Sequence, residues 1–250
     1  MIPTGRPGRR IKTEKTEGAE MKQRYDWLDL WRSLAVMTML VFHALWDLER
    51  FGVVAAGTME TPTADVVRYL GGGSFILISG MLALRAENAL RRGFFLFGVG
   101  IAVSLVTALA GLPVRFGILQ LIGICMLLCG ALREPLRRRT GPAYAAAYLL
   151  AFVGSWLLTA NVTVPWRFLY PFGLRAEGFF SADYWPLLPW GFLYLLGTQL
   201  GAALLRDRAA AARRRLPAAL SFPGRHSLAI YLVHQPLLYG LCFLLFSGKN

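Results

Sequence analysis

After Asp26 at its start, four ionisable side chains interrupt an otherwise apolar stretch near the N-terminus, DWLDLWRSLAVMTMLVFHALWDL at 26–48. They are Asp29, Arg32, His43 and Asp47. Ionisable groups inside a membrane-spanning helix are costly, and by default they mark functional sites. With about 100° of rotation per residue, all four fall within an arc of about 60° on one helical face. Because lipid cannot solvate that face, we expect it to point into the protein.

His43 and Asp47 have a spacing that suits acid–base chemistry. At i, i+4 on a helix, a carboxylate can orient an imidazole and raise its basicity, which prepares a general base. The alternative for this pair is a purely structural hydrogen bond. Asp29 and Arg32 stand at i, i+3 near the start of the segment, and the alternative for them is an ion pair that snorkels to the membrane surface.

Arg32 and His43 are eleven positions apart, which is roughly 16 Å along a helix. A cation near one membrane face and a base near the other suit a long substrate threaded between them. Acyl-coenzyme A has this form, because it joins a phosphate-bearing head to an extended thiol arm.

The rest of the chain supplies the elements that position these residues. Hydrophobic residues make up 56% and charged residues 16% of the 250 residues, whereas a soluble domain carries about 25% charged residues. We predict an all-α membrane bundle of about seven transmembrane helices, forming a single domain over 26–250. Only residues 111–113 separate the third and fourth helices, which predicts a tight helical hairpin. The apolar segments, each near the length of about 20 residues that spans a bilayer, are 27–47, 66–84, 93–112, 114–132, 143–160, 187–205 and 227–246.

Lys and Arg are distributed unequally between alternate connections. Twenty lie in the tail to Arg24 and in the connections at 85–92, 133–140 and 206–226, against six on the opposite side. This bias predicts a multi-pass protein of the cell membrane with a cytoplasmic N-terminus and an outside C-terminus. It also explains the net charge of +13 without a nucleic-acid partner. The basic N-terminal tail, 1–25, is polar and is predicted to be disordered in the cytoplasm.

Four further polar residues are candidates for the acceptor site or the channel. His234 and Gln235 lie inside the last segment, where an unpaired histidine is costly, so we expect them to face the bundle. A direct site role and structural hydrogen bonding are equally open for His234. Gln120 lies inside the fourth segment, and Asp183 lies at the outer mouth of the sixth, among tryptophans that otherwise anchor helices. The three cysteines have no partners at metal-ligand spacing, and we predict no metal site.

The sequence resembles known membrane enzymes at five places. Arg32, ten further residues and then His43 match the Arg-x10-His pattern of the membrane-bound acyltransferase-3 enzymes. The surrounding residues more closely resemble the heparan-α-glucosaminide N-acetyltransferase catalytic-domain family in its short bacterial form. The matching stretches are DLWRSLAVMTMLVFHALWDL at 29–48, GGGSFILISGM at 71–81, RFGILQLIGI at 115–124, DYWPLLPWGFLYLLGTQLG at 183–201 and GRHSLAIYLVHQPLL at 224–238.

The resemblance implies a transmembrane acyltransferase. Members of this superfamily take an acetyl group from cytosolic acetyl-CoA and pass it to a sugar amine or hydroxyl on the far side. Carried over to this chain, Arg32 with Asp29 beside it would help to hold the coenzyme or shape its channel. His43 would deprotonate the acceptor or carry the acetyl group, with Asp47 orienting it, and Asp183 becomes an acceptor-site residue. One departure is that the lysosomal enzyme has its catalytic histidine in the connection after this helix, whereas residues 48–70 contain none.

Two other functions fit the polar stripe on the first helix. A small proton-coupled transporter would use it as a proton or solute path, although the sequence has no inverted repeat and no matched pair of broken helices. A non-catalytic membrane subunit would use it for assembly with partners. The identity of the glycan or amino-sugar acceptor, the acyl chain length and homo-oligomerisation are open from the sequence.

Overall fold

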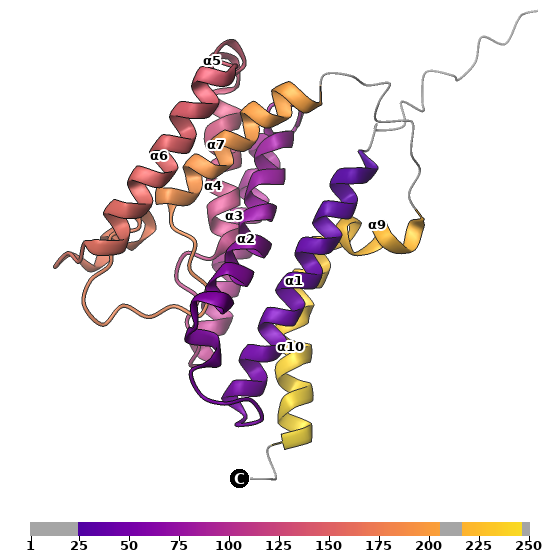
Figure 1. The fold of residues 1–250 in the computed structure, drawn as a ribbon, viewed down its shortest axis with the longest axis vertical. Helices are drawn as coiled ribbons and strands as arrows, with labels where there is room; N and C mark the ends of the chain where they lie inside the picture. Colours follow the sequence, from indigo (N-terminus) through magenta and orange to yellow (C-terminus); the bar gives the residue numbers. More distant parts are fainter. Residues whose placement is uncertain (1–24, 206–216, 247–250) are drawn as a thin grey trace, which may run out of the picture.

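The computed structural model describes residues 25–205 and 217–246, so the predicted N-terminal tail lies almost entirely outside the described residues. Figure 1 shows most helices running alongside one another, while α9 extends sideways from α1. In chain order the helices are α1 (Asp26–Arg50), α2 (Pro62–Ala83), α3 (Ala89–Leu109), α4 (Ile118–Ala131), α5 (Arg133–Arg138), α6 (Pro142–Asn161), α7 (Leu187–Leu204), α9 (Ala218–Arg225) and α10 (Ser227–Phe246), with 3-10 helices at Thr58–Glu60 and Arg167–Phe172.

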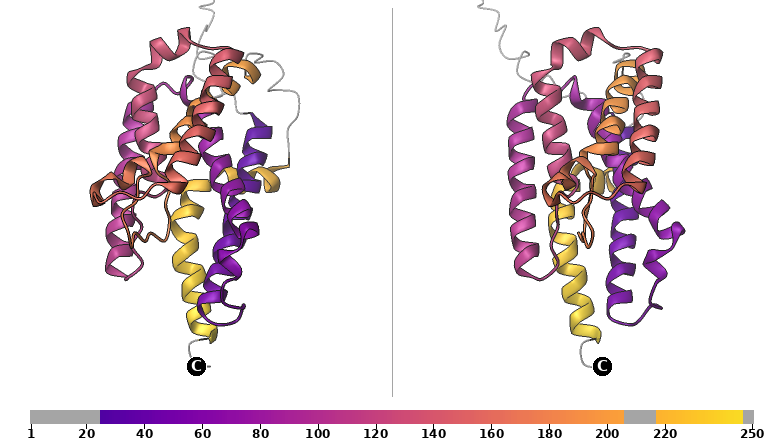
Figure 2. Two further views of the ribbon diagram at one scale, coloured as in Figure 1. Left: turned by 60° about the vertical axis from the view of Figure 1, so that its left-hand side comes forward. Right: turned by 90° about the vertical axis from the view of Figure 1, so that its left-hand side faces the viewer.

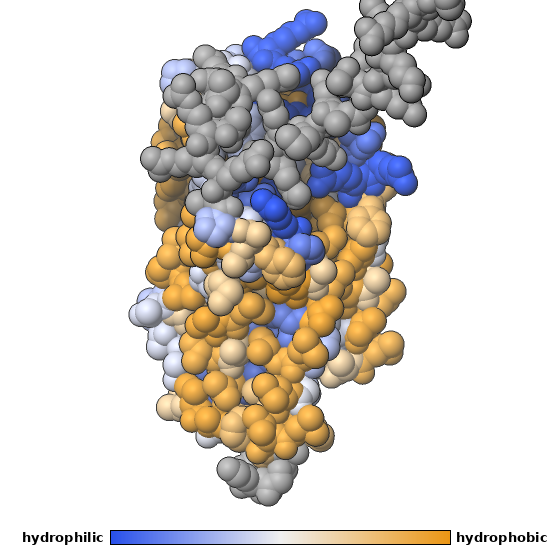
Figure 3. Space-filling model, turned by 90° about the vertical axis from the view of Figure 1, so that its right-hand side faces the viewer, coloured by the Kyte–Doolittle hydropathy of each residue, from blue (hydrophilic) through white to orange (hydrophobic). Residues whose placement is uncertain are grey.

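Six of these helices are long and apolar enough to cross a membrane, namely α1, α2, α3, α6, α7 and α10. Helix α4 is apolar but has only 14 residues. Together these seven helices match the seven predicted segments, which confirms the polytopic helical membrane bundle. Large apolar side chains cover the outside, as in Figure 3, where one face is hydrophobic over most of its lower part. That exposure is expected where lipid is the solvent.

The fourth helix begins later than the predicted start at residue 114. Residues 114–117 are not helical, because this strip pairs with the connection that precedes α7. The backbone N–H of Trp185 donates to the carbonyl oxygen of Phe116 at 2.9 Å, and that of Ala182 donates to the oxygen of Pro113 at 3.0 Å. The predicted tight hairpin is therefore a longer link, and it carries part of the long connection inward against α4.

Helices α2 and α7 pack closely enough to require glycine. A Cβ atom added to Gly201 would lie 2.0 Å from the carbonyl oxygen of Met81, and one added to Gly80 would lie 2.1 Å from that of Tyr194. Small residues let two membrane helices approach until their backbones touch, which maximises van der Waals packing. This seam holds α2 and α7 together between α1, which packs on α2, and α6, which packs on α7.

Helix α1 is held by α9 and α10 on its other side (Figures 1 and 2). The backbone N–H of Gly224 in α9 donates to the hydroxyl of Ser33 at 2.9 Å, and a Cβ at Gly224 would meet the carbonyl oxygen of Asp29 at 2.1 Å. Helix α9 lies in the region 206–226 that hydropathy alone describes as a basic connection. Its docking places the start of α10 against α1.

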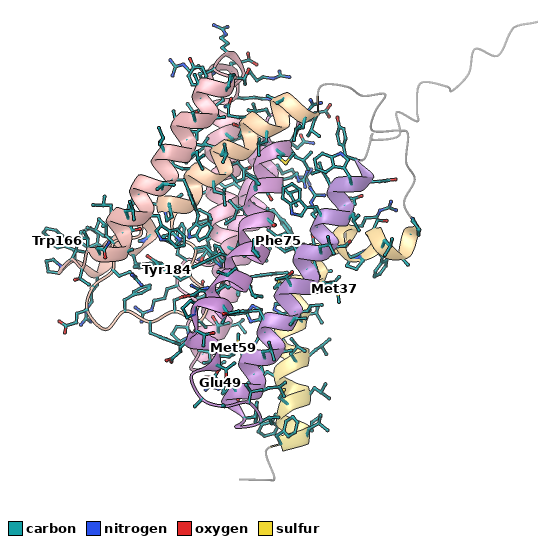
Figure 4. The ribbon with its side chains drawn as sticks, viewed as in Figure 1. Met37, Glu49, Met59, Phe75, Trp166 and Tyr184 are labelled. Carbon is teal, nitrogen blue, oxygen red and sulfur yellow. The ribbon has the colours of Figure 1, made fainter. Side chains whose placement is uncertain are left out.

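The connection that follows α1 is organised by the Glu49 carboxylate. It accepts hydrogen bonds from the backbone N–H groups of Gly57 at 2.6 Å and Met59 at 2.7 Å. Figure 4 shows Glu49 and Met59 close together at the lower end of α1. The acid thus fixes the short path from α1 into α2, which keeps these two helices adjacent.

Candidate functional site

A cavity of about 350 Å³ lies among α1, α2, α3, α4, α9, α10 and the connection before α7. We call its upper end the part that is lined by Arg32, Arg92 and Arg225. Its lower part is lined by Arg68 and Asp183. Apolar side chains line the walls between these polar groups, among them Phe42, Phe75, Leu96, Leu119 and Ile122. Figure 4 shows Phe75 on α2, near α1.

Asp29 forms ion pairs with two arginines at the upper end of the cavity. Its side chain is buried, with 3% of its surface exposed. The Arg32 Nη1 atom lies 3.2 Å from Asp29 Oδ1, and the Arg225 Nε atom lies 3.4 Å from Asp29 Oδ2. The predicted i, i+3 pair is therefore present, and α9 adds a second cation to it. Asp29 holds both guanidinium groups at the cavity wall but does not itself line the cavity.

His43 lines the cavity in the second half of α1, and its ring packs against His234 of α10. The two ring centroids are 4.8 Å apart with an angle of 59° between the planes. His234 is buried, and its Nδ1 atom lies 2.6 Å from the carbonyl oxygen of Tyr231. The structure thus brings together two histidines that are 191 positions apart in the sequence.

Asp47 pairs with α10 instead of with His43. Its side chain is fully buried, and its Oδ1 atom accepts a hydrogen bond from Gln235 Nε2 at 3.0 Å. Within the described residues, no hydrogen bond joins Asp47 to His43. The physical reason lies in α10, which packs along α1 and offers each of these side chains a nearer partner.

Asp183 closes the lower end of the cavity and receives hydrogen bonds from three directions. Its carboxylate accepts from the backbone N–H of Ile118 at 3.2 Å, the indole of Trp185 at 2.5 Å and the hydroxyl of Tyr231 at 3.2 Å. Burial raises the pKa of the Asp183 carboxyl above its usual range, although these bonds and the charge of Arg68 act in the opposite direction. Asp183 therefore links α4, the connection and α10.

Gln120 has a structural position outside this cavity. Its side-chain oxygen accepts from the backbone N–H of Gly117 at 2.6 Å, and its Nε2 atom donates to Ser104 at 3.1 Å. These contacts cap the start of α4 and tie it to α3. A channel-lining role for Gln120 has no support from its contacts, which satisfy both ends of the amide.

Two residues at the lower end, Arg68 and Tyr231, are absent from the sequence-based candidates. Tyr231 stands three positions before His234, so the helical period places both on one face of α10 and could have identified it. Arg68 carries no such signal. Its Nη2 atom lies 3.0 Å from Asp65 Oδ1, and its buried Nε has no hydrogen-bond partner within the described residues.

The described residues contain no group of three or more His, Cys, Asp and Glu side chains arranged to hold a metal ion. Cys125 and Cys129 are buried in the apolar core of α4 instead.

Comparison with known proteins gives one match. The family model described as heparan-alpha-glucosaminide N-acetyltransferase, catalytic, matches residues 24–236. No curated protein and no solved structure matches the chain. The family and the membrane-spanning helices together support a transmembrane acetyltransferase. Since the match covers most of the sequence, the chain belongs to the heparan-alpha-glucosaminide N-acetyltransferase catalytic-domain family.

Proposed function

We propose that this protein transfers an acetyl or other acyl group from acyl-CoA to a sugar amine or hydroxyl across the membrane. One observation carries the proposal: a single cavity is lined both by clustered arginines and by a partly buried histidine. Arginine recognises phosphate, and histidine is the most frequent general base. One cavity therefore holds the groups for binding the donor and for deprotonating the acceptor. The charge bias of the connections supports a donor from the cytosol and an acceptor from outside.

The donor would enter at the arginine end. Arg32, Arg92 and Arg225 offer planar donors that suit phosphate oxygens, and Asp29 holds two of them in place. The cavity volume of 350 Å³ is near the lower end of small-molecule pockets, which run from about 300 to 1,000 Å³. This size favours an arrangement in which the thiol arm lies inside and the nucleotide stays outside, against the arginines.

His43 would act on the acceptor as a general base. The acceptor X–H proton passes to a bare ring nitrogen of His43 while the X lone pair attacks the thioester carbonyl carbon. The carbon–sulfur bond then breaks, and the departing thiolate takes the proton from His43. The products are the acylated acceptor and free coenzyme A, and His43 returns to its neutral form. Asp47 contributes through Gln235, which fixes α10 beside α1.

The lower end of the cavity would hold the acceptor. Asp183 provides hydrogen-bond acceptors and Arg68 provides hydrogen-bond donors for sugar hydroxyls and amines, and Trp185 and Tyr231 add aromatic surface. The Asp183 carboxylate has about four acceptor sites, of which three receive hydrogen bonds within the protein. One site is left for a donor group on the acceptor.

A transfer assay tests this function. The protein is reconstituted in nanodiscs with acetyl-CoA carrying a labelled acetyl group and a panel of amino sugars and lipid-linked glycans. We expect labelled product from wild type and a loss of about 10² to 10⁴ in kcat for His43→Asn, the range that general base catalysis contributes. His226→Asn is the matched control, because His226 is exposed between α9 and α10 and does not line the cavity.

The proposal is wrong if His43→Asn and wild type transfer the label equally. It is also wrong if no acceptor is labelled while proteoliposomes take up a solute or protons, since that result identifies a transporter. Coenzyme A itself should raise the thermal unfolding temperature of wild type, because a ligand that binds only the folded state stabilises it.

A further inference from the structure

The chain has three histidines, and two of them meet at the α1–α10 contact. His234 is held more tightly than His43, because its Nδ1 atom lies 2.6 Å from the carbonyl oxygen of Tyr231. A carbonyl oxygen only accepts hydrogen bonds, so the Nδ1 atom of His234 must carry the proton. The contact therefore selects one tautomer of the neutral ring.

The selected tautomer leaves the Nε2 atom of His234 as a lone-pair acceptor. This atom is buried and has no hydrogen-bond partner within the described residues. A buried polar atom without a partner costs roughly 1–3 kcal/mol, so such atoms usually mark a place where a donor belongs. The neighbouring ring of the described chain that can supply an N–H is His43, whose centroid lies 4.8 Å away. Rotation about χ2 of histidine is soft, which allows the two rings to align.

We propose that His234 is the positioning residue of the reaction and accepts a hydrogen bond from one ring nitrogen of His43. This bond fixes the His43 tautomer and leaves its other nitrogen bare toward the cavity, where the proposed function needs a base. The inference rests on that function for its catalytic meaning, but the hydrogen bond itself does not depend on it.

A histidine partner suits this place better than a carboxylate does. Asp47 accepts its hydrogen bond from Gln235, and none joins it to His43 within the described residues. Neutral His234 also keeps the resting pair uncharged, which avoids the cost of an ion within the membrane. During transfer, the acceptor proton reaches the bare nitrogen of His43 and leaves with the thiolate. His234 gains no proton and keeps its hydrogen bond to His43 through both steps.

Nitrogen NMR of the ring atoms tests the pairing directly. Protein labelled with ¹⁵N-histidine shows only three rings, and His226→Asn removes the exposed one. We expect His234 to be protonated at Nδ1 and His43 to be in one neutral tautomer with a hydrogen-bonded N–H. In His234→Phe, His43 should become a mixture of tautomers.

Kinetics test the positioning role. His234→Phe should lower kcat about ten- to a hundredfold, which is part of the 10² to 10⁴ that a general base contributes. KM for donor and acceptor should stay unchanged, because His234 does not line the cavity. His234→Gln should recover part of the rate, since its amide oxygen can accept from His43.

Each result decides between the two claims. Protonation of His234 at Nε2, or an unchanged His43 tautomer in His234→Phe, overturns the pairing. A wild-type kcat in His234→Phe overturns the positioning role even where transfer is found. If the NMR pattern holds but no acceptor is ever acylated, the pairing stands and the proposed function fails. If His234→Phe does not fold, the wild-type spectrum and His234→Gln give the decision.

Discussion

Gln235 on α10 donates a 3.0 Å hydrogen bond to the fully buried Asp47 on α1. The two residues are 188 positions apart, and the bond joins the first and last helices of the described chain. The second oxygen of Asp47 has no partner within the described residues. Loss of Gln235 therefore leaves a buried acid without a donor.

The first prediction concerns this bond. Gln235→Leu should destabilise the protein by about 1–3 kcal/mol, the cost of a buried polar group left unpaired. Replacing both partners, as in Asp47→Leu with Gln235→Leu, should recover most of that loss, because two apolar groups of similar size need no hydrogen bond. Denaturant titration in mixed micelles measures the free energies of unfolding. Strict additivity of the two substitutions would contradict the pairing.

The second prediction concerns the glycine seam between α2 and α7. Gly201→Ala should destabilise the protein by about 1–3 kcal/mol, because its Cβ would lie 2.0 Å from the carbonyl oxygen of Met81. Gly154→Ala is the matched control, since a Cβ there meets nothing within 4 Å. The free energy of unfolding of the control should rise by about 0.5–1 kcal/mol, because alanine has a better helix propensity than glycine. Thermal unfolding followed by tryptophan fluorescence compares the two variants. Equal changes in unfolding temperature would contradict close packing of α2 and α7 at Gly201.

The third prediction concerns pH and Asp183, which lies outside the membrane-spanning helices. Its pKa is raised in the folded state, chiefly by burial, so the folded protein holds this proton more tightly than the unfolded chain does. The resulting stability is complete below the unfolded pKa of about 3.9 and is lost as pH rises through the folded pKa. Asp183→Asn cannot ionise and should not show this loss.

The measurement is the unfolding temperature of wild type and Asp183→Asn between pH 4 and pH 8. The unfolding temperature of Asp183→Asn should rise relative to that of wild type as pH rises. A difference that is constant with pH, or that shrinks, would show that Asp183 is ionised in the folded state throughout this range.

The fourth prediction concerns the arginine end of the cavity. Arg225→Gln and Arg32→Gln should each raise KM for acyl-CoA about ten- to a hundredfold, since a hydrogen bond to a charged group contributes about 1.5–3 kcal/mol. Arg167→Gln removes the same charge from an exposed connection and should leave KM unchanged. Initial rates at varied acyl-CoA give these constants. A rise of the same size in all three variants would indicate a general effect of charge.

The helices could be predicted from the sequence because the bilayer demands about 20 apolar residues for each crossing. Helical periodicity also predicted the polar arc on α1, and two of its members, Arg32 and His43, line one cavity. The helical period alone cannot tell which members of the arc reach the cavity. Asp29 and Asp47 instead turn toward neighbouring side chains.

The partners of these residues could not be predicted, because they lie far away in the sequence. The i, i+4 spacing relates Asp47 to His43, but it carries no information on Gln235 or His234. The start of α4 was misplaced for a similar reason. Hydropathy continues through residues 114–117, but this strip pairs with the connection before α7 and is not helical.

Helix α10 packs mainly along α1, and much of its remaining surface is apolar and exposed. The Gln235–Asp47 hydrogen bond and the His43–His234 ring contact help to set its position along α1. A bilayer that is thicker or thinner than α10 applies a mismatch force to that helix. We therefore expect the register of the two histidine rings to depend on lipid chain length, so bilayer thickness should be fixed in every assay of this protein.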